Sequence, residues 1–98
     1  MIVEIKDVNH FEVIEFPNAD SLKIRMRGIA MHSILSVTKI TSHIEGTTLT
    51  VKVHLGFIVM NRSSSRTSYF DYEVTVPNSV EKVQFGNQGA LVWQQKRN

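Results

Sequence analysis

Four histidines carry the most specific chemistry that this sequence offers, because imidazole groups bind metal ions and transfer protons near neutral pH. They are His10, His32, His43 and His54, with equal spacing between the last three. A hairpin turn at Glu45-Gly46 would place His54 near Val37, and in the same register His32 near Val59. Metal ligands must converge within a few ångströms. The histidines therefore predict no metal site.

Motifs of hydrolases and nucleotide-binding proteins do not occur in the sequence. No G-x-S-x-G motif frames a serine, and there is neither a G-x-G-x-x-G motif nor a P-loop. Acidic pairs such as Asp71 and Glu73 alternate with apolar residues, which is typical of the wet side of a strand. We therefore expect no catalytic residue and no cofactor.

Basic residues gather at two places where they could bind an anion. They are Lys23, Arg25 and Arg27, which alternate with apolar residues, and Arg62 and Arg66, which flank three serines. Guanidinium, hydroxyl and amide groups together could hold a phosphate, although nucleic-acid bases would also require interleaved aromatic residues. The simpler interpretation is a charged outer strand face and a solvated loop. Phosphate or nucleic-acid binding therefore stays the alternative function.

Apolar strand residues in excess of one two-layer core predict a contact surface. The interface candidates are Ile58, Met60, Leu91 and Trp93. Aromatic and methionine side chains gain much from burial at contacts, although Trp93 could equally close the core. We predict a non-enzymatic binding or assembly module that forms a homo-oligomer, expected to be a dimer, or contacts another protein. In a closed barrel, the same surplus could instead line a cavity for a small apolar ligand.

The stretch from Glu45 to Met60 is the element around which these residues are expected to be arranged. Its apolar residues recur at every second position, which places Leu49, Val51, Val53, Leu55, Phe57 and Val59 on one face of a strand. Thr48, Thr50, Lys52 and His54 occupy the other face. Gly56 interrupts the polar face and indicates a bend, a bulge or a close backbone approach.

The remaining segments predict further short strands. We expect them at residues 2–8, 11–16, 22–26, 68–76, 82–85 and 90–94, with turns at 9–10, 17–20, 77–79 and 86–89. Gly28 indicates a bulge or a strand that passes between sheets. The segment that starts at Val80 could begin with one helical turn before the strand at residues 82–85. Leu91 and Trp93 are expected on one face.

Residues 31–44 are ambiguous, but β-branched residues favour a strand there. Spacing of about ten residues predicts an all-β fold, namely a small antiparallel β-sandwich or partly closed barrel of seven to eight strands. The alternative is an α+β fold with one helix within 31–44 packed on an antiparallel sheet.

Length and composition are those of a single globular domain spanning residues 1–98. Of its 98 residues, 42% are apolar and 20% are charged, and the net charge is only +2. The longest apolar run, from Leu55 to Met60, is far shorter than the roughly 20 residues that span a bilayer, so no membrane segment is expected. Cysteine is absent, and no basic segment precedes an apolar one at the start of the sequence. If Met1 is the natural start, these features predict a cytoplasmic protein.

Overall fold

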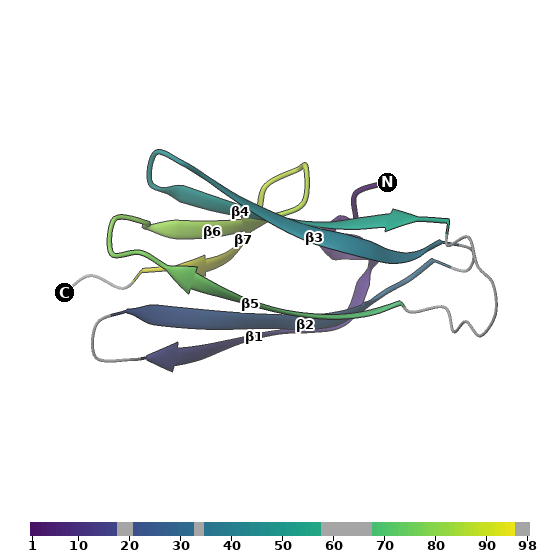
Figure 1. Cartoon of the computed structure of the whole chain (residues 1–98), viewed down its shortest axis with the longest axis horizontal. Helices are drawn as coiled ribbons and strands as arrows, with labels where there is room; N and C mark the ends of the chain where they lie inside the picture. The colour runs from purple at the N-terminus through teal and green to yellow at the C-terminus, as the bar shows by residue number, and fades with distance from the viewer. Residues whose placement is uncertain (18–20, 33–34, 58–67, 96–98) are drawn as a thin grey trace.

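A computed structural model describes residues 1–17, 21–32, 35–57 and 68–95. These residues form two sheets that pack face to face (Figure 1), a three-stranded sheet of order β1-β2-β5 and a four-stranded sheet of order β3-β4-β6-β7. The strands are β1 (Val8–Pro17), β2 (Leu22–Ala30), β3 (Ser36–Glu45), β4 (Thr48–Gly56), β5 (Tyr69–Val76), β6 (Lys82–Phe85) and β7 (Ala90–Gln94). The predicted all-β sandwich is confirmed. The sheets do not close into a barrel, and residues 36–45 are a strand and not a helix.

Alternating residues of β4 form the centre of the core. Leu49, Val51, Val53 and Leu55 are buried, while the residues between them are only half-buried. Burying each such side chain stabilises the fold by about 1.5–3 kcal/mol. The dry face predicted for this stretch is therefore confirmed from Leu49 to Leu55.

Strand β4 has partners along both of its edges. β3 pairs with one edge in a hairpin whose turn contains Gly46 at a φ of 62°, as predicted for Glu45-Gly46. The first half of the other edge pairs with β6 in parallel, which departs from the all-antiparallel expectation. Its second half is covered by the N-terminal residues, since Val3 N donates to Val53 O at 3.0 Å and Leu55 N to Met1 O at 2.8 Å.

Side chains from both sheets complete the core. Phe85 of β6 lies between two aromatic rings of the other sheet, Phe11 of β1 at a centroid distance of 5.4 Å and Phe70 of β5 at 5.9 Å. Ile24 and Met26 from β2 are also fully buried. Contacts between rings add to the energy gained by burying their area.

The N-terminal prediction of two strands with a turn at residues 9–10 is wrong. Ile2 makes only an isolated bridge to His54, residues 5–7 form one turn of 3-10 helix, and β1 runs without a break from Val8. The register shifts between Asn9 and Glu12, and His10 has a φ of 56°. A bulge thus replaces the expected turn and returns the apolar residues of β1 to the inner face.

Strand β2 passes through Gly28 in regular pairing with Phe70 and stays in one sheet, so the predicted sheet crossing is wrong. The predicted bulge does occur at this level, but its extra residue is in β1, where the register shifts between Asn9 and Glu12 opposite Gly28. The glycine is required by space, because a Cβ atom there would lie 2.5 Å from Val8 Cγ1 and 3.1 Å from the Phe70 ring. Gly28 is therefore a special position, as the sequence indicates, because the side chains of Val8 and Phe70 lie close to its Cα atom. Gly56 similarly ends β4 beside Thr38, 3.2 Å from the position of a Cβ atom.

Three other local predictions need correction. Phe57 was expected to be buried but is 76% exposed, because β4 ends at Gly56. The hairpin register is displaced by two residues, so His54 pairs with Lys39 instead of Val37. Val80 is buried after a turn, with no helix, whereas the strands at 69–76 and 82–85 are confirmed.

Leu49 and Leu91 provide a matched test of the core, since one is 1% exposed and the other 55% exposed. Leu49→Ala should lower the free energy of unfolding by about 2–5 kcal/mol, because it removes buried methyl groups and leaves a cavity. Leu91→Ala should change it by at most about 0.5 kcal/mol. Urea unfolding followed by circular dichroism measures both values, and equal losses would contradict the burial of β4.

Candidate functional site

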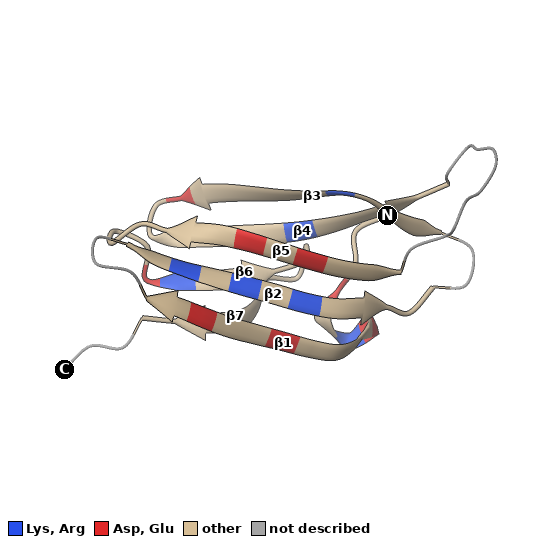
Figure 2. Cartoon of the chain, turned by 60° about the horizontal axis from the view of Figure 1, so that its bottom comes forward, with Lys and Arg blue, Asp and Glu red and all other residues tan. Residues whose placement is uncertain are grey.

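The outer face of the three-stranded sheet brings together the cations predicted to bind an anion. Lys23, Arg25 and Arg27 lie on β2, the central strand, and acidic residues lie on the strands at both sides (Figure 2). Antiparallel pairing sets Glu12 of β1 opposite Arg27 and Glu73 of β5 opposite Arg25. The basic stripe expected from the sequence is therefore the middle of a mixed acidic and basic surface.

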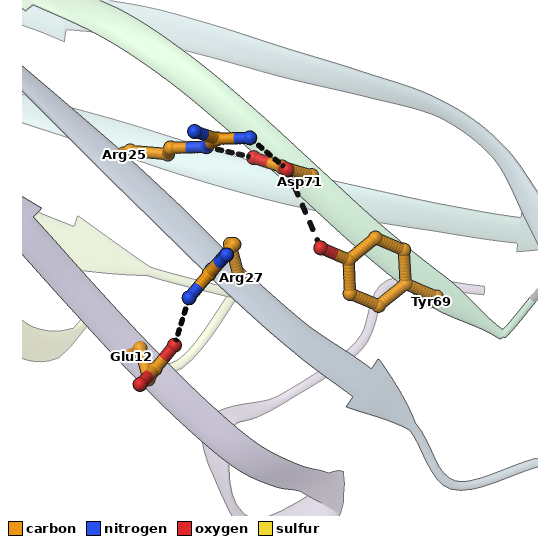
Figure 3. A network of polar contacts seen from close by, with 5 residues as sticks. All are labelled: Glu12, Arg25, Arg27, Tyr69 and Asp71. Atoms are coloured by element: carbon orange, nitrogen blue, oxygen red, sulfur yellow. Dashed lines mark hydrogen bonds and ion pairs between the residues drawn. The ribbon is translucent and has the colours of Figure 1, made fainter.

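Both arginines of this face are engaged by carboxylates (Figure 3). Arg25 binds Asp71 with two hydrogen bonds, of which the one from Nε to Oδ1 is 2.6 Å long, and Arg27 donates to Glu12 Oε1 at 2.6 Å. The hydroxyl of Tyr69 donates to Asp71 Oδ2 at 3.3 Å. Hydrogen bonding and charge attraction from Arg25 hold the pKa of Asp71 below its ordinary value. An external anion would have to displace these carboxylates.

The other predicted anion ligands are separated from this network. Lys23 pairs across the strands with Phe16 and Thr75, and it makes no ion pair with any residue that the structure describes. Arg62 and Arg66 lie outside the described residues. The structure therefore brings Lys23, Arg25 and Arg27 onto one face, where Lys23 is the one cation of the three without an ion pair to a described residue.

Two of the histidines have different polar partners. His54 Nε2 lies 2.9 Å from Thr41 Oγ1, and His32 Nδ1 accepts a hydrogen bond from Leu35 N at 3.1 Å. Desolvation, together with the charges of Lys39, the N-terminus and Lys52, lowers the pKa of His54. Within the described residues, no group of three or more His, Asp or Glu residues could hold a metal ion.

The interface candidates Leu91 and Trp93 lie on opposite faces of β7, so the shared face predicted for them is wrong. A register shift in β7 pairs Trp93 with Val83 and Leu91 with Gln84. The bulge turns the indole ring toward the core and leaves Leu91 exposed. Ile58 and Met60 lie outside the described residues.

Trp93 joins the two sheets at one side of the sandwich. Its Nε1 donates a hydrogen bond of 2.8 Å to Glu15 Oε2 on β1. At the opposite side, Tyr72 of β5 donates to Ser42 Oγ of β3 at 3.1 Å. These contacts support the interpretation in which Trp93 closes the core.

Segments that carry exposed apolar residues meet at one end of the sandwich, a feature that sequence reasoning missed. Among the described residues, eight large hydrophobic side chains are exposed, and five belong to segments that meet at the right-hand end in Figure 1. These five are Met1, Ile29, Met31, Phe57 and Tyr69, and we call them the apolar end. Ile29 and Tyr69 are cross-strand neighbours, while Met1 is tied to Leu55 near the end of β4. Their proximity depends on strand order, for which the sequence has no local signal.

The chain matches no protein-family model, and it has no significant match among curated proteins or solved structures.

The pairing of Asp71 with Arg25 predicts a measurable change in titration. Because the folded pKa of Asp71 is lowered, its contribution to stability is present above the pKa of an unfolded aspartate and is lost as the pH falls through the folded pKa. Arg25→Gln should move the Asp71 pKa upward in a carboxyl NMR titration. Lys23→Gln, which removes a charge from the same strand, should leave it near its original position. Equal shifts in both variants would contradict the pairing.

The hydrogen bond from Trp93 can be tested by fluorescence, since this is the chain's one tryptophan. Glu15→Leu removes the acceptor, so the emission maximum should move and the free energy of unfolding should fall by about 1 kcal/mol. Glu73→Leu makes the same change on β5 and should leave the emission unaltered. Identical spectra for wild type and Glu15→Leu would show that the indole does not depend on this contact.

Proposed function

We propose that this chain is a non-enzymatic binding or assembly module that acts through protein–protein contacts, including contacts between its own copies. The apolar end is the contact surface. The observation that carries the proposal is the exposure of Phe57 and Met31, at 76% and 60%, in segments that end at the same end of the sandwich as those of the other three residues. Large apolar side chains that cluster on a surface are typical of interaction sites, and aromatic and methionine residues are common anchors there.

The surroundings of the β2 arginines and of the core residues favour this function over anion binding and over binding of a ligand in a cavity. Anion binding on β2 would compete with the carboxylates that already hold Arg25 and Arg27. A ligand cavity would require a barrel, whereas the chain forms two open sheets filled by a common core. The apolar end requires no rearrangement to meet a partner.

A reducing compartment such as the cytoplasm is the proposed location, supported by a sequence without cysteine. No helix in the described part of the chain is long and apolar enough to cross a membrane.

Phe57 and Phe16 allow a matched test, because they are exposed phenylalanines at opposite ends of the sandwich. We expect the wild type to associate at micromolar concentration in sedimentation velocity. Phe57→Ser should raise the dissociation constant about tenfold, since one anchor residue is worth more than about 1 kcal/mol. Phe16→Ser should leave it nearly unchanged. A wild type that stays monomeric, or equal effects of the two substitutions, would contradict the proposal.

A further inference from the structure

Within the described part of the chain, the outer edge of β3 is an unpaired strand edge. β3 is ten residues long and is the last strand of the four-stranded sheet, where β4 is its one partner among the strands that the structure describes. Every residue from Thr41 to Glu45 is exposed. Long open edges present unpaired N–H and C=O groups and are templates for pairing with another strand. This edge is therefore able to accept a further strand.

The sequence of β3 is complementary to itself when two copies run antiparallel. A twofold axis at Ser42 would set Lys39 opposite Glu45 of a second copy. The same register opposes Ile40 with Ile44, and Thr41 with His43. Each of these pairs occurs twice across the axis. Opposite charges and β-branched residues are favourable cross-strand neighbours.

The faces of the strand agree with this register. Ile40 and Ile44 pair with Val53 and Leu49 of β4, so both lie on the inner face of the sheet. Lys39 and Glu45 pair with His54 and Thr48, so both lie on the outer face. A twofold axis perpendicular to the sheet would therefore place Ile40 opposite Ile44 on the inner face and Lys39 opposite Glu45 on the outer face.

Neighbouring registers lose this complementarity. An axis at Thr41 would set Lys39 opposite His43 and Val37 opposite Glu45, whereas an axis at His43 would set Glu45 opposite Thr41. Neither Lys39 nor Glu45 makes an ion pair within the described part of the chain, and Ile44 is 44% exposed. These groups are thus available to a partner.

We propose that two copies of this chain pair through β3 about a twofold axis at Ser42, joining their four-stranded sheets into one. The inference rests on the proposed function in that it makes a second copy the partner, but it uses a surface separate from the apolar end. An assembly module with both surfaces would extend beyond the dimer.

Charge exchange tests the register. Lys39→Glu would place two glutamates opposite each other at both symmetric positions, so the dissociation constant measured by sedimentation should rise about tenfold. The double variant Lys39→Glu with Glu45→Lys should return to within about threefold of the wild type. Lys52→Glu makes the same charge change on β4 and should have little effect. Failure of the double variant to recover would overturn the proposed register.

Crosslinking tests the axis, because a cysteine introduced into this cysteine-free chain has only its own copy to react with. Ser42→Cys should form a disulfide-linked dimer under mild oxidation, since opposed residues of antiparallel strands lie within disulfide distance. Thr75→Cys, at an exposed position on β5, should remain largely monomeric. Equal crosslinking of the two variants would overturn the edge contact.

The two proposals fail in different ways. Suppose that Phe57→Ser weakens association, that Lys39→Glu does not, and that Ser42→Cys shows no preferred crosslink. The β3 contact is then excluded, and the apolar end remains as the contact surface. If Lys39→Glu weakens association and Phe57→Ser does not, the apolar end is excluded and the β3 contact remains. Crosslinking of Ser42→Cys that persists in the Phe57→Ser background supports an edge contact independent of the apolar end.

Discussion

Burial of one face of β4 between its neighbours and the opposite sheet is the constraint on which the structure depends. Leu49, Val51 and Val53 are at most 1% exposed. Because successive strand residues point to opposite sides, this burial fixes which residues of β3 and β6 face inward. A shift of one residue in β4 would move its whole apolar set to the solvent. The orientation of the β3 residues in the proposed edge contact follows from this register.

The N-terminal segment completes the surroundings of β4 where β6 ends. Its Glu4 side chain accepts hydrogen bonds from Asn87 N at 3.0 Å and Gln88 N at 3.1 Å, in the turn between β6 and β7. Gly86 begins this turn with a φ of 82°, and a Cβ atom there would overlap the Glu4 carboxylate. The first residues therefore connect the turn to the far half of β4. This arrangement also brings Met1 to the apolar end.

Alternation of apolar and polar residues was enough to predict β4 and β5, because both strands keep a strict period of two. It failed at the bulges near His10 and before Trp93, since one extra residue reverses the face of everything beyond it. Gly28 was recognised as unusual, but only the packing of Val8 and Phe70 shows why a side chain is excluded there.

The candidate surfaces were less predictable than the strands. Lys23, Arg25 and Arg27 were correctly placed together, but Asp71, the carboxylate partner of Arg25, comes from β5, a strand distant in sequence. The apolar end likewise depends on which strand ends meet, a property of topology and not of any local pattern. The complementarity of β3 was present in its sequence, yet it gains meaning only once β3 is known to be an edge.

Amide hydrogen exchange measures the central claim directly, because exchange from the core of a sheet requires the opening of the strands that protect it. The amides of β4 around Val51 and Val53 should exchange most slowly, together with those of β2 around Ile24 and Met26. The amides of the edge strand β7 should exchange faster. Exchange at Val51 and Val53 as fast as in β7 would contradict an architecture organised around the buried face of β4.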